Sequence, residues 1–252
     1  MSNQEALSVA SLLQAYATHC YRNPSIRRKD GILHVSDVSS SCGWSCDRYI
    51  EYIRTAETRV NDVSHIPLQV WPVLWVGQGI EQMLDNVLDE ACQTSLPALG
   101  FTLVSLEKQP RFEDKELGLV GHADYVLTYR TKSGEQRRQV IDAKSTSPAR
   151  DAKRAIGSQG RAVSRADLDH IRQVAIYRHY FECDYGSLLY VTKSGVPRIS
   201  DGFVDGSKVV PLLQQRLRRI DEEMSNGCRP IPSRGTYCSD CRWSQLCESE
   251  GI

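Results

Sequence analysis

The stretch that decides the fold is LVGHADYVLTYR–TKSGE–QRRQVIDAKS, residues 119–145. Two runs rich in β-branched and aromatic residues flank a short polar turn, and this pattern predicts a β-hairpin. If Lys132–Gly134 forms a three-residue loop, Gly134 takes the left-handed conformation that such loops favour. Pairing of the two strands then places Asp124 directly opposite Asp142.

The predicted hairpin brings charged groups together on one face. Side chains alternate along a strand, so Lys144 shares a face with Asp142. Two facing carboxylates destabilise a sheet, and Lys144 or a divalent metal ion would compensate them. One alternative is a solvated strand pair that Lys144 neutralises. Both strand faces are largely apolar, however, which is typical of strands inside a sheet, where unpaired charge is costly. The pattern therefore favours a metal site.

Composition permits one large core, or one domain with a small appendage, in 252 residues. The chain carries 31 basic and 31 acidic residues, so its net charge indicates neither nucleic acid nor membrane as a partner. Basic residues nevertheless gather between Arg130 and Arg172, as in a rim that binds a polyanion or in a solvated loop. They are Lys132, Arg137, Arg138, Arg150, Lys153, Arg154, Arg161 and Arg165, and the part from Arg150 to Arg165 is the candidate for gripping phosphates.

The sequence has no apolar run long enough to span a membrane. Its first residues include an acidic one and lack the positive region of a signal peptide. They instead predict an amphipathic helix, with Leu7, Ala10, Leu12, Leu13 and Tyr16 on one side. We therefore expect a cytoplasmic protein without a membrane partner.

Nine cysteines in a cytosolic protein favour metal or cluster ligation over disulfides. Cys238, Cys241 and Cys247 form a C-x2-C-x5-C pattern, and Cys42 and Cys46 lie far upstream. A zinc site of Cys42, Cys46, Cys238 and Cys241 would pair two short spacings, as zinc ribbons do. That set would leave Cys247 unused, and the spacing alone leaves a zinc site and a cluster both open.

A helix is predicted from about Val73 to Ala91, with Gly77, Glu81, Leu84 and Leu88 along one stripe. Glu81 on this stripe either points toward the acidic pocket or extends to water at its margin. Gly77, one turn earlier, would permit close packing.

Further elements complete the predicted α/β order. A second helix, from about Ser164 to Phe181, places Gln173 and Tyr177 on one face, where they could equally be ordinary boundary residues. The remaining predictions are strands at about 101–107 and 187–193 and an amphipathic helix at 209–224.

These residues resemble a known family. Glu81, Asp124, Asp142-Ala143-Lys144 and Gln173-Val174-Ala175-Ile176-Tyr177 are similar to the motifs of the PD-(D/E)XK nuclease superfamily, in its RecB-like branch. Cys46-Asp47-Arg48 and the three C-terminal cysteines resemble the iron–sulfur subgroup with Cas4-like and AddB-type nucleases. The chain departs from that pattern with Glu81 in place of a common histidine, Asp47 in place of proline, and Asp142 in place of the more frequent glutamate.

The resemblance implies a mixed central sheet flanked by helices, a restriction-endonuclease-like core, with a terminal iron–sulfur lobe. One nuclease domain would span residues 1–252, with its core at about 70–200 and the lobe formed by about 35–60 and 226–252. Cys46, Cys238, Cys241 and Cys247 would hold a [4Fe–4S] cluster.

The resemblance also implies residue roles. Glu81, Asp124 and Asp142 would hold Mg²⁺ or Mn²⁺ together with the Ala143 carbonyl, and Lys144 would orient the attacking water. Gln173 and Tyr177 would position the substrate strand.

The expected activity is that of a metal-dependent DNA exonuclease acting on single-stranded ends or overhangs, in CRISPR spacer acquisition, phage recombination or end resection. A helicase, integrase or recombination protein would be its partner, because the chain lacks the GxxxxGK[ST] motif of a motor. The alternative is a non-catalytic nucleic-acid-binding module that keeps the fold and the cluster.

Overall fold

The computed structural model describes residues 31–55, 71–146, 167–192, 199–203, 206–241 and 243–251. The predicted N-terminal helix and the basic segment from Arg150 to Arg165 lie outside these residues. Among the helices of the described part, none is both long and apolar enough to cross a bilayer.

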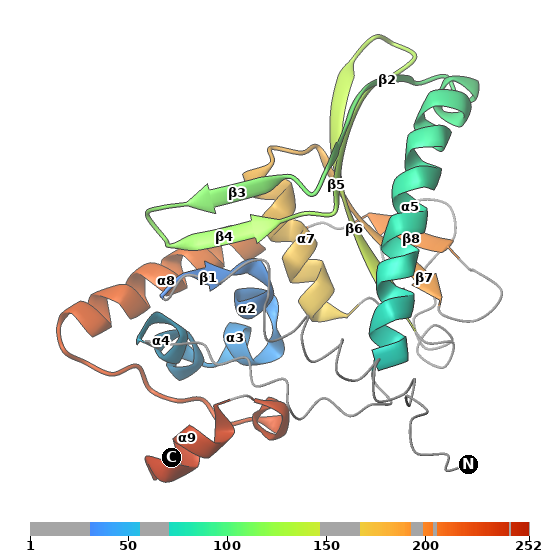
Figure 1. Ribbon diagram of the computed structural model, residues 1–252. Coiled ribbons are helices and arrows are strands. Elements are labelled where there is room, and N and C mark those ends of the chain that lie inside the picture. The colour runs from blue at the N-terminus through green and yellow to red at the C-terminus, as the bar shows by residue number, and fades with distance from the viewer. Residues whose placement is uncertain are drawn as a thin grey trace, which may run out of the picture.

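A five-stranded sheet forms the centre of the fold (Figure 1). Its strands lie in the order β2-β5-β6-β7-β8, where β6 and β7 are parallel and the other neighbours antiparallel. The strands are β2 (Thr102–Lys108), β5 (Tyr125–Arg130), β6 (Gln136–Thr146), β7 (Tyr185–Thr192) and β8 (Ile199–Phe203). The predicted mixed sheet is confirmed, and β5 and β6 lie inside it, as their two apolar faces indicated.

The predicted hairpin forms with the expected register. Val126 pairs with Val140, and the last printed pair before the turn is Arg130 with Gln136. The Thr131 N–H donates to the Glu135 carbonyl at 2.8 Å, which leaves three residues in the loop. Gly134 has a φ of 84°, so the left-handed position falls on the residue that tolerates it best.

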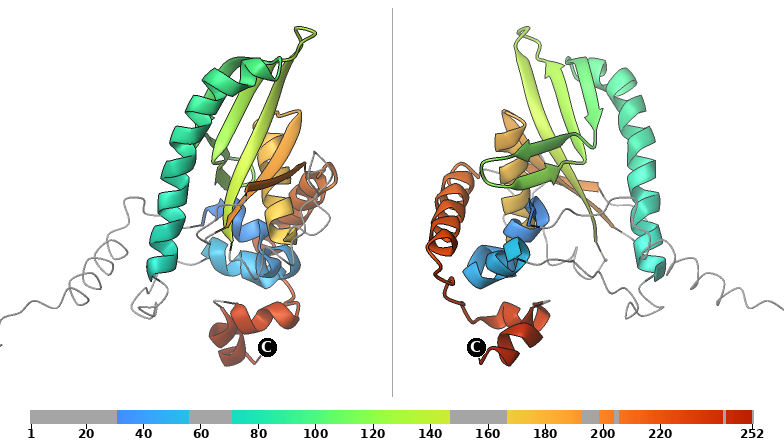
Figure 2. Two further views of the ribbon diagram at one scale, coloured as in Figure 1. Left: turned by 90° about the vertical axis from the view of Figure 1, so that its right-hand side faces the viewer. Right: turned by 60° about the vertical axis from the view of Figure 1, so that its left-hand side comes forward.

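Helices α5 (Trp71–Ala98) and α7 (Leu168–Tyr180) cover opposite faces of this sheet (Figures 1 and 2). Alternation along the strands separates two sets of apolar side chains. Leu84 of α5 packs with Tyr125, Leu189 and Val191, whereas α7 packs on the face that carries Val126, Val140, Leu188 and Tyr190. Helix α5 is longer than the predicted 73–91, and α7 begins at Leu168 within the described residues.

A second, smaller sheet was not predicted. It has the order β1-β4-β3, with β1 (Leu33–His34) parallel to β4 (Leu119–His122) and β3 (Arg111–Asp114) antiparallel to it. The chain leaves the large sheet after β2 and returns to it before β5. These two crossing segments lie side by side, and the Gln109 N–H of the first donates to the Asp124 carbonyl of the second at 2.8 Å. Asp124 therefore lies at a bend, directly before β5.

The remaining helices surround the small sheet and the chain end. They are α2 (Val35–Ser39), α3 (Ser41–Ser45), α4 (Asp47–Thr55), α8 (Val209–Ser225), the 3-10 helix η2 (Thr236–Asp240) and α9 (Ser244–Ser249). Helix α8 buries Val210, Leu213, Leu217 and Ile220, which confirms the predicted amphipathic helix. The segment with η2 and α9 lies beside α3 and α4 (Figure 2).

Candidate active site and cysteine cavity

The structure brings the two aspartates and the lysine of the hairpin together. Asp142 points into the protein from β6, with 1% of its surface exposed. Lys144 Nζ lies 2.8 Å from Asp142 Oδ2. Asp124 Oδ2 accepts a hydrogen bond of 2.7 Å from the Ala143 N–H. The spatial prediction that underlies the site is therefore confirmed for these three side chains.

The site holds more negative than positive charge in a buried setting. Burial raises the pKa of Asp142 to about 6, although the Lys144 ammonium opposes the shift, and the Asp124 carboxylate adds to it. Burial also raises the pKa of Asp124, against Lys144 and the Ala143 N–H. One lysine does not offset the two carboxylates, so the site favours binding of a proton or a further cation.

The donor set has the chemistry of a hard-cation site. Its groups are carboxylate oxygens, which Mg²⁺ and Mn²⁺ prefer. Asp142 Oδ2 is buried and accepts no hydrogen bond of regular geometry beyond its ion pair with Lys144. A cation at this oxygen would supply the partner that it lacks.

These carboxylates do not yet form a ligand set. In the part of the chain that the structure describes, no three histidine, cysteine, aspartate or glutamate side chains lie close enough together to hold a metal ion. Lys144 occupies the Asp142 oxygen in this arrangement.

Glu81 reaches the site from helix α5 but is exposed rather than packed. Partial burial and then the Asp124 carboxylate raise the pKa of Glu81, whereas Lys144 lowers it, so its carboxylate is within electrostatic reach of both. Leu84 is buried, and Glu81 lies at the margin of that stripe. A Cβ at Gly77 would lie 3.7 Å from the Ser145 hydroxyl, an ordinary contact, so helix α5 faces the end of β6 here at a distance that does not require glycine.

Asp85 is a site residue that the sequence analysis missed. It follows Glu81 by one helical turn, and its Oδ1 accepts a hydrogen bond of 2.9 Å from the Tyr125 hydroxyl. Its charge contributes to the raised pKa values of Glu81 and Asp124. The i, i+4 spacing from Glu81 was the available signal. Asp85 thus ties α5 to the start of β5, next to Asp124.

Helix α7 carries Gln173 and Tyr177, which lie beside Asp142 and Asp124, as predicted. The Gln173 Nε2 donates to the Tyr177 hydroxyl at 3.1 Å. Burial raises the pKa of Tyr177, and the charges of Asp142 and Asp124 add to the shift, which places the hydroxyl near both. An unpredicted neighbour is His170, whose Nδ1 is 2.8 Å from the Tyr190 hydroxyl.

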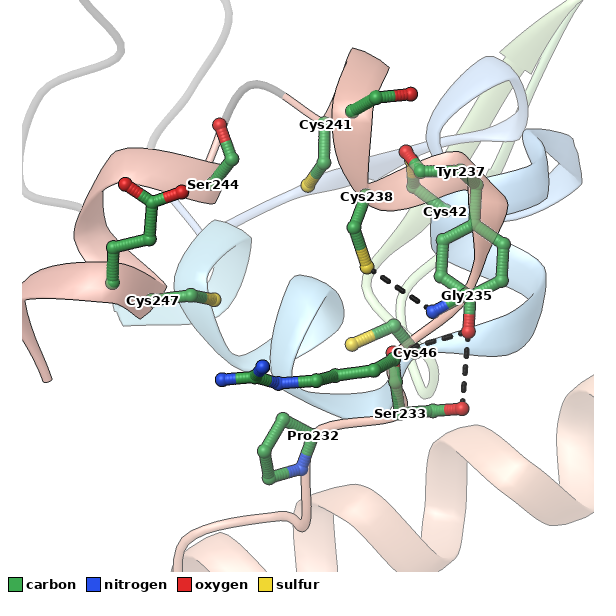
Figure 3. A pocket seen from close by; sticks show the side chains of 13 residues that line it. Cys42, Cys46, Pro232, Ser233, Gly235, Tyr237, Cys238, Cys241, Ser244 and Cys247 are labelled. Atoms are coloured by element: carbon green, nitrogen blue, oxygen red, sulfur yellow. Dashed lines mark hydrogen bonds between the residues drawn. The ribbon is translucent and has the colours of Figure 1, made fainter. Parts of the chain in front are cut away.

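A second site is a cavity of about 440 Å³ between α3 and the C-terminal segment. Five of the nine cysteines line it, and Figure 3 shows that the sulfur atoms of Cys238, Cys241 and Cys247 point into the same space as that of Cys46. The fifth is Cys42. The prediction that these distant segments meet is confirmed, but their sulfurs do not form the close group that a single ion requires in the described residues.

Polar contacts hold the cavity walls in place. The Gly235 N–H donates to Cys238 Sγ at 3.3 Å, and the Cys247 thiol donates to the Tyr52 hydroxyl at 3.7 Å. Cys42 Sγ donates to the Tyr237 carbonyl at 3.3 Å. Burial, followed by the neighbouring Cys241, raises the pKa of Cys42 to about 12.

Asp47, where the resembling family has proline, anchors the upstream wall. Its carboxylate accepts hydrogen bonds from Arg216, at 2.6 Å, and from Arg219, both on α8. Burial by itself would raise the pKa of Asp47, but these two arginines outweigh it and hold the pKa below its ordinary value. These ion pairs hold the start of α4, directly after Cys46, against α8.

A family model described as the PD-(D/E)XK nuclease superfamily matches residues 29–248. No curated protein shows significant sequence similarity to the chain.

Two solved structures are similar to the chain. The crystal structure of SSO0001 has a TM-score of 0.52 and 17% identity, over 94% of this chain and 97% of that one, a likeness of fold. A candidate exonuclease from Eubacterium rectale has a TM-score of 0.42 and 14% identity, over 96% of this chain and 93% of that one.

Proposed function

Because the chain belongs to the PD-(D/E)XK nuclease superfamily, we propose that it hydrolyses DNA phosphodiester bonds with a divalent metal ion. We further propose an exonuclease of the RecB-like, Cas4-like type that acts on single-stranded ends or overhangs in the cytoplasm. The observation that carries this proposal is the buried Asp142 carboxylate beside Lys144 and Asp124. Such a group gains a partner when a cation binds.

In this proposal Asp124, Asp142 and Glu81 hold Mg²⁺ or Mn²⁺ with the Ala143 carbonyl. When bound, the ion neutralises phosphate charge and lowers the pKa of water. Lys144 then breaks its ion pair with Asp142, orients the attacking water and stabilises the developing negative charge on the phosphate. Its side chain is 22% exposed, so it can reach a substrate.

The surrounding groups position the substrate. Gln173 and Tyr177 lie within reach of the acids, and their hydroxyl and amide groups are suited to phosphate oxygens. The basic segment from Arg150 to Arg165 would contact flanking phosphates by charge. Processive resection would require a helicase or another recombination partner, such as an integrase in spacer acquisition.

A cleavage assay tests the proposal. Single- and double-stranded DNA labelled at the 5′ or 3′ end is incubated with Mg²⁺ or Mn²⁺. Lys144→Ala should bind DNA and lose cleavage, whereas Asp124→Ala should lose metal affinity as well. Lys115→Ala, at an exposed position in the β3–β4 turn, is the matched control and should cleave normally. Normal cleavage by Lys144→Ala would refute the assignment, and binding without cleavage by the unmodified protein would indicate a non-catalytic module.

We also propose a [4Fe–4S] cluster in the cysteine cavity, with Cys46, Cys238, Cys241 and Cys247 as ligands. The donors are soft thiols, which suit iron–sulfur clusters and zinc. Cys247 lines the same cavity, and a zinc site of Cys42, Cys46, Cys238 and Cys241 would leave it unused, which supports the cluster over zinc.

Metal analysis decides between these cofactors. An anaerobic preparation should be brown and contain iron and acid-labile sulfide. A colourless protein with stoichiometric zinc would refute the cluster without affecting the nuclease proposal.

A further inference from the structure

The cysteine cavity contains one thiol more than a four-ligand site needs. Its C-terminal wall supplies three cysteines, here called the C-terminal triad, namely Cys238, Cys241 and Cys247. The upstream wall supplies two, Cys42 and Cys46, where one would suffice. Both upstream side chains line the same cavity, so position alone does not exclude either from binding.

Local structure presents both upstream cysteines to the cavity. The Cys46 N–H donates to the Cys42 carbonyl at 2.9 Å, so the two residues lie one helical turn apart across α3. Arg216 of α8 donates to the Gly43 carbonyl at 2.6 Å and also to Asp47. Because Arg216 contacts the chain on both sides of this turn, the two thiols are held at a constant spacing.

Cys42 makes the direct contacts across the cavity. Its thiol donates to the Tyr237 carbonyl at 3.3 Å, within the η2 turn that carries Cys238. The Cys241 thiol lies close enough to raise the pKa of Cys42. Cys42 therefore already touches the C-terminal wall, while Cys46 is fixed beside it through Asp47.

Thiolates bind soft metals through the same atom with similar chemistry, so the choice between two adjacent cysteines depends on reach. We propose that Cys42 and Cys46 are alternative ligands, and that either one completes a four-thiolate site with the C-terminal triad. This inference rests on the proposed thiolate-bound cofactor and is independent of the nuclease activity.

Alanine variants test the inference, because serine could itself bind metal through oxygen. The full-length variants are Cys42→Ala, Cys46→Ala, the double variant and Cys238→Ala. Cys228→Ala is the matched control, since Cys228 is exposed and does not line the cavity. Each protein is reconstituted anaerobically with iron and sulfide, and separately with zinc. Metal and sulfide per chain, visible absorption and the electron paramagnetic resonance spectrum of the reduced protein are then measured.

We expect each upstream single variant to keep most of the metal, with the spectrum of an all-thiolate site, and the double variant and Cys238→Ala to lose it. In the loaded unmodified protein, one of the two upstream thiols should react with iodoacetamide, as peptide mass spectrometry would show. Loss of the metal in either upstream single variant would overturn the inference. Retention in the double variant, or an unmodified protein that binds neither iron–sulfur nor zinc, would overturn it as well.

Discussion

Replacing the buried Asp142 with asparagine should make the metal-free protein more stable at neutral pH while it abolishes cleavage. The folded protein raises the pKa of this carboxyl to about 6, whereas an unfolded chain has about 4. Each pKa unit corresponds to about 1.4 kcal/mol, so ionised Asp142 costs the folded state about 3 kcal/mol. Asparagine removes that cost because its side chain does not ionise.

The sign of the pH dependence follows from proton binding. The folded state binds the Asp142 proton more tightly than the unfolded state, so the free energy of unfolding falls as the pH rises from about 4 to about 6. The Asp142→Asn protein lacks this fall. The stability advantage of Asp142→Asn over the unmodified protein should therefore grow by about 1 kcal/mol between about pH 5 and about pH 7.5.

Urea unfolding of both proteins in chelator, across this pH range, measures the difference. Asp184→Asn is a control of opposite sign, because the Arg138 N–H donates to Asp184 at 2.8 Å and, with Arg137, holds its pKa below the ordinary value. Asp184→Asn should therefore have a lower free energy of unfolding than the unmodified protein above about pH 4. A difference between Asp142→Asn and the unmodified protein that stays constant with pH would refute the reasoning.

Four further substitutions have defined outcomes. Gly43→Ala should destabilise the protein by about 3 kcal/mol, because its Cβ would overlap a carbonyl oxygen of α2. Gly79→Ala, with open space around the new Cβ, should stabilise α5 by about 1 kcal/mol, and thermal unfolding compares the two. Asp47→Ala should cost about 2 kcal/mol in urea unfolding, and this loss should vanish as the pH falls below about 4 because its arginines lower its pKa. Tyr125→Phe should reduce the cleavage rate, since Asp85 loses its hydrogen bond; an unchanged rate would contradict that role.

The hairpin was predictable because its evidence is local. Strand alternation defines which face Asp142 and Lys144 share, and Gly134 specifies the turn, so both survive any change in distant packing. Gln173 and Tyr177 follow from helical spacing in the same way. For these elements the sequence pattern and the tertiary contacts agree.

The small sheet could not be predicted, because its evidence is not local. Strand β1 has two residues, and β3 and β4 have four each. Strand β1 pairs with β4 although nearly ninety residues separate the two in the sequence. Likewise, the bend that places Asp124 before β5 depends on a contact with Gln109. The exposure of Glu81 depends on how α5 lies on the sheet, which no spacing within the helix specifies.

The contact between Cys42 and Cys241 has a consequence for folding. A cofactor coordinated by both Cys42 and Cys241 would close a ring of about 200 residues. This ring contains every described strand except β1. By the chain-entropy argument, such a ring restricts the denatured chain enough to raise the free energy of unfolding by about 5 kcal/mol. Cofactor loss would then destabilise the distant β5–β6 hairpin through the entropy of the unfolded chain, with no change in any contact of the folded one.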